Sequence, residues 1–181
     1  KDKPFSIAFF ITGHYIEENH WYRNVDEGTR ICGNLGHWLD LSIHLIKLKQ
    51  LNLTDLEINI TYSDTKSTSE NLSVTITTPD NDMIVIIFST RGEPFEGVSE
   101  TINFQQGDII AKIDDHKEMK IWNKDNYYHY KNRLKDVGHK AAILQPFLSD
   151  NKRDWEEVIV STKLILTVTD MVNNSIKYQH F

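Results

Sequence analysis

The feature that most constrains the fold is a series of six short strand-like segments in the middle of the chain. Each is alternating or β-branched and ends at turn-forming residues such as Pro79–Asp82 and Gln105–Asp108. Short connections join antiparallel neighbours, so the sequence predicts a meander. The six segments are Leu56–Tyr62, Leu72–Thr78, Met83–Thr90, Ser99–Phe104, Ile109–Asp114 and Glu118–Trp122.

Elements on either side of the meander complete the predicted domain. Residues 5–13 form a further strand, and residues 34–49 have an apolar stripe at helical spacing, with Asn34 as N-cap. A second apolar stripe runs from Leu134 to Leu148, and a final helix is expected from about Asp154 to Val172. We predict one α+β domain over residues 1–181, with a largely antiparallel open sheet of about six to seven strands and helices packed on one face.

The second face of this sheet has no predicted helix to cover it. Ile84–Phe88 is apolar at successive positions, which predicts a strand buried on both faces. Water, a partner subunit or another domain is left to cover the open face.

Composition and charge exclude several function classes. The formal net charge of −6 and the lack of a basic run argue against nucleic acid or an anionic membrane surface as the main partner. No apolar stretch approaches the roughly 20 residues that cross a bilayer. The single cysteine, Cys32, favours a reducing compartment, so we expect a cytoplasmic protein. The sequence has no Gly-x-Gly-x-x-Gly and no phosphate-binding loop.

Three ionisable residues fall on one edge of the helix predicted over 34–49. His37, Asp40 and His44 stand at positions i, i+3 and i+7. His37 is then a general acid or base with Asp40 setting its tautomer, or the three bind a metal, or they are structural. No Glu follows His37 as in the metalloprotease helix motif, so we predict no metal, and we favour a structural role for His44. Glycines near the helix start give a ligand access to His37.

The run Gly28–Leu41, which includes Gly-Asn-Leu-Gly-His-Trp-Leu-Asp-Leu, resembles the first helix of the C-terminal domain of the Gfo/Idh/MocA oxidoreductases. This is the glucose–fructose oxidoreductase and inositol dehydrogenase family. Asn19–Trp21 and Lys135–His139 resemble weaker motifs of one branch, and the resemblance covers nearly the whole chain. Asn34 and Asn19 stand where that branch has Glu and Asp, which puts acid–base roles at those positions in doubt.

The resemblance implies that this chain is the substrate-binding and oligomerisation domain of a larger enzyme. The N-terminal Rossmann domain, which binds NAD or NADP in the family, is expected to be absent from this chain. The chain alone is then inactive in oxidising or reducing a sugar, sugar derivative or cyclitol. Its partners are the sugar substrate, its own Rossmann domain, and further copies in a homo-dimer or tetramer formed through the sheet. His37 matches the family's active-site histidine, and Asp40 matches the aspartate that follows it.

Polar and aromatic residues before this helix are the candidates for substrate contact. Aromatic faces stack on sugar rings, and an arginine can hold a carboxylate or phosphate. A packed loop anchor is the alternative for Trp21, and a surface position near a helix start is the alternative for the weaker candidates Lys135 and His139. The predicted substrate-binding residues are Tyr15, His20, Trp21, Arg30 and Asn34.

Two other functions are compatible with the same sequence. One is a stand-alone binding or assembly domain that keeps the fold without redox chemistry. The other is a fragment of a glycosidase that uses a bound nicotinamide transiently.

Overall fold

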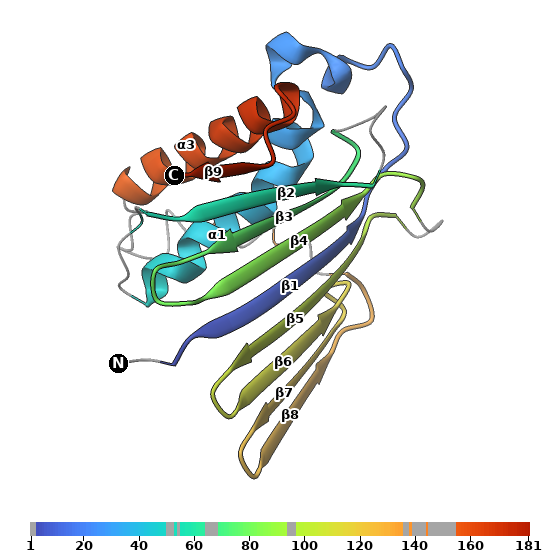
Figure 1. Ribbon diagram of the computed structural model, residues 1–181. Helices are drawn as coiled ribbons and strands as arrows, with labels where there is room; N and C mark the ends of the chain where they lie inside the picture. The colour runs from blue at the N-terminus through green and yellow to red at the C-terminus, as the bar shows by residue number, and fades with distance from the viewer. Residues whose placement is uncertain are drawn as a thin grey trace.

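The computed structural model describes residues 3–49, 53, 55–63, 69–93, 97–135, 138, 144 and 155–181. They form one nine-stranded sheet with two long helices on one face (Figure 1). The strand order across the sheet is β8-β7-β6-β5-β1-β4-β3-β2-β9. The predicted α+β class and the largely antiparallel open sheet are confirmed.

The elements follow the predicted order closely. The helices are α1 (Gly36–Leu48) and α3 (Trp155–Asn173). The strands are β1 (Phe5–Thr12), β2 (Glu57–Tyr62), β3 (Asn71–Thr77), β4 (Met83–Ser89), β5 (Ser99–Gln106), β6 (Ile109–Asp114), β7 (Glu118–Asn123), β8 (Asn126–Lys131) and β9 (Tyr178–His180).

The first strand lies in the middle of the sheet rather than at an edge. β1 is antiparallel to β5 on one side and parallel to β4 on the other, and the remaining pairs are antiparallel. Because β1 and β4 run in the same direction, the residues that follow them emerge at the same end of the sheet. Gly13 and Ser89 meet there through a 2.8 Å backbone hydrogen bond.

The core lies between the helices and the strands β1–β4. Strand residues alternate between this core and the opposite face, as the period of two requires. The helices bury one stripe each against the same strands (Figure 1). Fully buried members of this core include Phe9, Leu39, Ile43, Ile46, Leu164 and Val168.

Two strands were not predicted, and one predicted helix lies largely outside the described residues. β8 is an edge strand whose six residues are all exposed, and β9 has only three residues, so neither has a clear alternating pattern. The helix expected between Leu134 and Leu148 falls largely outside the described residues. The final helix is confirmed as α3.

The described residues leave the second face of the sheet uncovered. Ile84, Ile86 and Phe88 are buried under the helices, but Met83 and Ile87 on the other side of β4 are 44% and 38% exposed. Among the described residues β4 is therefore buried on one face only, and burial of its second face by a partner copy stays a prediction. The reason is that the described residues supply a layer on only one side of the sheet.

No helix in the described part of the chain combines the length and apolar character needed to cross a membrane.

Candidate functional site

An irregular helical turn leads into α1 and sets the direction of the first residues of that helix. Residues Ile31–Leu35 form a π-helical turn, in which the backbone N–H of Gly36 donates to the carbonyl of Ile31. Such turns are uncommon and occur often at functional sites. A Cβ on Gly36 would lie 3.4 Å from the Ile165 side chain, an ordinary contact distance, so the start of α1 packs directly against α3.

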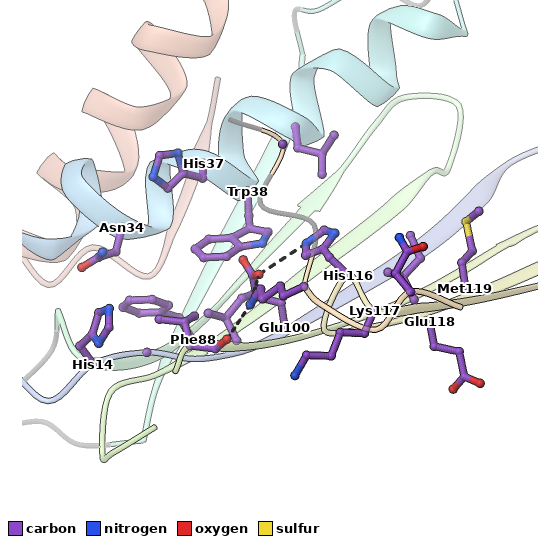
Figure 2. Close-up of a pocket in the computed structure, with 18 of the residues that line it drawn as sticks. His14, Asn34, His37, Trp38, Phe88, Glu100, His116, Lys117, Glu118 and Met119 are labelled. Atoms are coloured by element: carbon purple, nitrogen blue, oxygen red, sulfur yellow. Dashed lines mark hydrogen bonds and ion pairs between the residues drawn. The ribbon is translucent and has the colours of Figure 1, made fainter. Parts of the chain in front are cut away.

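A cavity of about 990 Å³ lies beside this helix start (Figure 2). It is bounded by the first turn of α1, by the ends of β1 and β4, and by residues near the β6–β7 turn. The volume suits a small-molecule ligand. Its apolar wall includes Ile11, Trp38, Leu41 and Phe88, and its polar groups include His14, Asn34, His37, Glu100, His116 and Lys135.

His37 and Asn34 present polar groups to this cavity from the helix side (Figure 2). His37 is exposed, and its ring meets the ring of Trp38 edge-on at 6.1 Å. Oδ1 of Asn34 is buried and has no hydrogen-bond partner among the described residues. A buried carbonyl oxygen normally accepts a hydrogen bond, so Asn34 can accept one from a ligand hydroxyl or amide.

Asp40 and His44 contact the second helix rather than the cavity. Oδ1 of Asp40 accepts a 2.5 Å hydrogen bond from the Ser161 hydroxyl, and Nδ1 of His44 lies 3.1 Å from Oε1 of Glu157. Both partners belong to α3. The predicted polar edge is therefore divided, with His37 on the cavity side and the other two residues at the α1–α3 interface. Described residues include no group of three or more His, Cys, Asp or Glu arranged to hold a metal.

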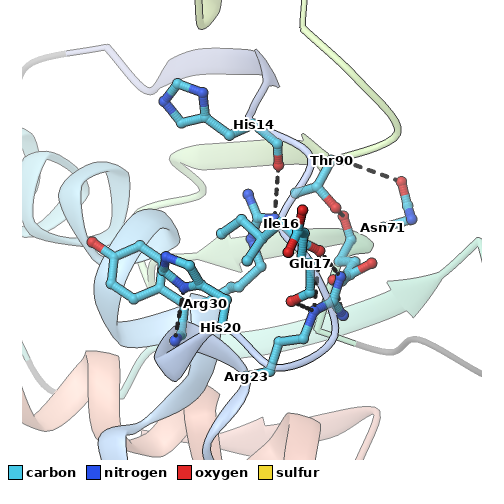
Figure 3. Close-up of polar contacts among 10 residues, drawn as sticks. His14, Ile16, Glu17, His20, Arg23, Arg30, Asn71 and Thr90 are labelled. Atoms are coloured by element: carbon cyan, nitrogen blue, oxygen red, sulfur yellow. Dashed lines mark hydrogen bonds and ion pairs between the residues drawn. The ribbon is translucent and has the colours of Figure 1, made fainter.

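The loop residues predicted to contact substrate lie mostly outside the cavity lining. Tyr15 and Trp21 are 68% and 58% exposed. His20 caps the short turn Trp21–Arg23, accepting the N–H of Tyr22 at 3.2 Å (Figure 3). The ring of His20 also stacks on the ring of Trp21. Of the five predicted substrate contacts, Asn34 alone is among the residues that line the cavity.

Arg30 lies beneath the cavity instead of facing it. Its side chain is 1% exposed, with the guanidinium 5.8 Å above the centre of the Phe88 ring. Nη1 donates a 2.7 Å hydrogen bond to the carbonyl of His14 (Figure 3). Burial lowers the pKa of Arg30 to about 10, against the opposing effect of the Glu70 charge. Arg30 therefore fixes the backbone at the end of β1, in contrast to the direct sugar contact that the sequence suggested.

Lys135 anchors a charged network at another part of the cavity wall. Its Nζ lies 2.8 Å from both Glu100 Oε2 and Asp115 Oδ1 and donates to the carbonyl of Val98 at 2.6 Å. Burial alone would lower the pKa of Lys135, but the hydrogen bonds to Asp115 and Glu100 outweigh burial and raise it. Each of the three ammonium N–H groups of Lys135 thus has an acceptor, which favours a structural role in which Lys135 holds these three residues together. The other candidate in that motif, His139, lies outside the described residues.

Sequence reasoning missed a second histidine in the same cavity. Nδ1 of His14 lies 2.5 Å from Oε2 of Glu93. His14 follows β1 and Glu93 follows β4, so their proximity depends on the parallel pairing of these two strands. The only signal in the sequence was that each residue comes shortly after a predicted strand.

Comparison with protein-family models and with curated proteins gives no match. Several solved structures share the fold. A Gfo/Idh/MocA family oxidoreductase from Vibrio cholerae is 18% identical, with a TM-score of 0.59 over 94% of this chain and 53% of that chain. A putative oxidoreductase from Thermotoga maritima is 9% identical, with a TM-score of 0.67 over 97% of this chain and 54% of that chain.

A third similar structure has a named activity. UDP-N-acetylglucosamine 3-dehydrogenase from Acidithiobacillus ferrooxidans is 12% identical, with a TM-score of 0.61 over 94% of this chain and 53% of that chain. The present chain thus spans about half the length of each of these structures. At sequence identities this low, the similarity shows a shared fold and nothing more. This chain therefore has the fold of one half of a Gfo/Idh/MocA family oxidoreductase.

Proposed function

We propose that this chain is the substrate-binding half of a nicotinamide-dependent oxidoreductase that acts on a hydroxyl or keto group of a sugar, sugar derivative or cyclitol. The observation that carries the proposal is the cavity at the start of α1, where His37 and Asn34 face an apolar wall. The similar structures include a UDP-N-acetylglucosamine dehydrogenase and an aldose–aldose oxidoreductase from Caulobacter crescentus, which supports a sugar-related substrate.

Each lining group has a defined task in this proposal. Oxidation of a carbinol removes one proton from oxygen and one hydride from carbon. His37 takes the proton, because an imidazole can change its charge near neutral pH. Oδ1 of Asn34 accepts a hydrogen bond from a second ligand group, and Trp38 and Phe88 cover the C–H face of the ring and exclude water.

The hydride is accepted or supplied by NAD or NADP when the cofactor is bound. The buried, unpartnered Oδ1 of Asn34 and the aromatic wall beside it fit a carboxamide-bearing ring as well as they fit a sugar. The remainder of the dinucleotide belongs to a Rossmann domain outside this chain, in keeping with the absence of a glycine-rich phosphate-binding motif. On this proposal, the chain alone binds a ligand but does not turn it over.

The test compares two histidine variants of the complete natural protein on a panel of sugars and cyclitols. His37→Ala is expected to lower turnover by about 10²- to 10⁴-fold, the usual contribution of an acid–base group. His44→Ala is the matched control, because His44 lies on the same helix but contacts Glu157 of α3. Normal turnover of His37→Ala on every substrate that the wild type uses would refute the proposed role.

The exposed apolar side chains on the open face of the sheet support a second part of the proposal, a homo-dimer or tetramer formed through that face. Phe10 of β1 is 50% exposed, and Met83 and Ile87 lie on the neighbouring strand β4. Phe10→Glu should shift the molar mass measured by light scattering toward that of a single chain. Tyr15→Glu, a change in an exposed loop residue, should leave the mass unaltered.

A further inference from the structure

The cavity beside α1 continues onto the outer strands of the sheet. A row of directly paired side chains crosses β5, β6, β7 and β8, beginning in the core and ending at the edge of the sheet. Its members are Ile102, Ile113, Met119 and Tyr130. Ile102 is buried, the next two are half-buried, and Tyr130 is 54% exposed. The last three line the cavity, which therefore has an apolar floor whose accessibility increases toward the sheet edge.

This floor lies away from the residues assigned to the reacting ring. Asn34 and His37 stand at one end of the cavity and Met119 at the other, with Trp38 between them (Figure 2). Met119 points to the helix side of the sheet, whereas the neighbouring Glu118 points away from it (Figure 2). A cavity of about 990 Å³ is at the upper end of the range for small-molecule sites, so it has room for a ligand with more than one ring.

The charged groups between these two ends neutralise one another. Nζ of Lys135 lies 2.8 Å from carboxylate oxygens of both Glu100 and Asp115. Nζ of Lys117 lies 2.9 Å from the second oxygen of Asp115. Two ammonium groups thus contact two carboxylates. Among the described residues that line the cavity, these two lysines are the only Lys or Arg side chains.

An anionic substituent of a ligand would have to compete with these ion pairs. A phosphate held by either lysine would leave a partly buried carboxylate without its counter-charge, which is costly. Arginine is the side chain best suited to hold a phosphate at two points. Arg30, however, is buried beneath the cavity, with its guanidinium over the Phe88 ring. The described part of the cavity wall therefore favours uncharged ligand groups.

We propose that Met119 and Tyr130 form a second subsite, which takes the second ring of an uncharged glycoside such as a disaccharide, while His37 acts on a hydroxyl of the first ring. The tyrosine ring and the thioether cover the C–H face of the second ring, and the phenolic hydroxyl stays at the wet rim. This inference rests on the proposed function and narrows its substrate class to neutral compounds of two rings, in place of nucleotide sugars and sugar phosphates.

The first experiment compares substrates on the complete natural protein. The panel holds glucose, galactose and myo-inositol, the disaccharides cellobiose, maltose and lactose, and the anionic compounds glucuronic acid and UDP-glucose. At least one disaccharide should exceed its constituent sugars about 10-fold in kcat/KM, chiefly through KM, and should exceed both anionic compounds. A preference for UDP-glucose or glucuronic acid, or no disaccharide above its constituent sugars, would overturn the inference.

The second experiment locates the second ring with variants of β8. Tyr130→Ala should cost about 10-fold in kcat/KM on the preferred disaccharide, a larger factor than on its constituent sugar, and Tyr130→Phe should restore the wild-type preference because it keeps the ring face. Tyr128→Ala is the matched control, because Tyr128 is 46% exposed on the same face of β8 but lies outside the described cavity lining. Equal losses on both substrates in Tyr130→Ala, or the same pattern in Tyr128→Ala, would count against the subsite.

A protein segment covering Met119 and Tyr130 is the competing occupant, and thermal unfolding without ligand detects it. An unchanged Tm in Tyr130→Ala supports a subsite open to ligand. A Tm lowered as far as by a core substitution shows that protein covers the ring and overturns the inference.

Calorimetric binding of the same sugars to His37→Ala separates this inference from the proposed function. Tighter binding of the disaccharide than of its constituent sugar, lost when Tyr130→Ala is added, supports the subsite even if His37→Ala keeps full turnover, a result that refutes the proposed function alone. Turnover that depends on His37 but shows no preference for a disaccharide overturns the subsite alone.

Discussion

The carboxylate of Asp82 connects three parts of the fold, and its removal should be the most damaging polar substitution in the described chain. Asp82 is 0% exposed. Its Oδ1 accepts from the Phe5 backbone N–H at 2.8 Å and from Nζ of Lys49 at 2.5 Å, and its Oδ2 accepts from the Thr78 hydroxyl at 2.9 Å. The start of β1, the end of α1 and the β3–β4 turn therefore meet at one side chain.

The magnitude follows from what Asp82→Ala would leave behind. The Lys49 side chain is only 9% exposed, so its ammonium would remain buried without its counter-charge. Removing one member of a buried ion pair costs about 3–5 kcal/mol, and we expect the free energy of unfolding to fall by about 4 kcal/mol. Adding Lys49→Met should recover a large share of that loss, because the uncompensated charge is then gone.

The assay is urea unfolding followed by circular dichroism, with the single and double variants forming one cycle. Asp108→Ala is the matched control, since Asp108 lies exposed in another hairpin turn and should change stability by less than about 0.5 kcal/mol. A loss below about 1 kcal/mol for Asp82→Ala, or purely additive effects of the two substitutions, would refute this reasoning.

Two further predictions concern the approach to α1 and Lys135 at the cavity wall. Gly28 has φ +79°, and a Cβ there would lie 2.6 Å from Sγ of Cys32, so Gly28→Ala should lower the unfolding free energy by about 1–2 kcal/mol in the same assay, with a smaller loss contradicting the backbone argument. Burial alone would raise the pKa of Asp115, but hydrogen bonds from Lys135 and Lys117 outweigh it and lower that pKa. The stabilisation is therefore present above the ordinary carboxyl pKa of about 3.9 and disappears as pH falls through the lower folded value. The destabilisation caused by Lys135→Met should accordingly be largest at neutral pH and become smaller as the pH is lowered below the ordinary carboxyl pKa of about 3.9; a loss that does not change with pH would count against this ion pair.

The parts of the fold that local pattern encodes were predictable, and the parts that depend on distant pairing were not. In strands such as β2, exposed and buried residues alternate. This period of two is visible in the sequence whichever strand pairs with β2. β8 lacks that signal because both of its sides are exposed at the sheet edge. The parallel pairing of β1 with β4 joins segments separated in the chain by α1, β2 and β3, and no local sequence feature specifies it.

The same difference between local sequence pattern and contacts of distant segments explains which residues of the candidate site could be predicted. His37 could be singled out because helical spacing and the resemblance both depend on neighbours in the sequence. Arg30 was interpreted as a ligand contact because an arginine can hold a carboxylate or phosphate, whereas here tertiary packing buries it against the Phe88 ring. The pair His14–Glu93 required knowledge of which strand ends meet, and it became visible only in the folded chain.

The central place of β1 gives this strand a distinct mechanical role in the sheet. On one side it holds the group β4, β3, β2 and β9, and on the other the group β5 to β8, so the two groups share no strand pairing except through it. Removing residues 5–12 from their place would therefore separate the sheet into two smaller sheets. A displacement of β1 would also move Gly13, which is hydrogen-bonded to Ser89, and His14, and both residues line the cavity.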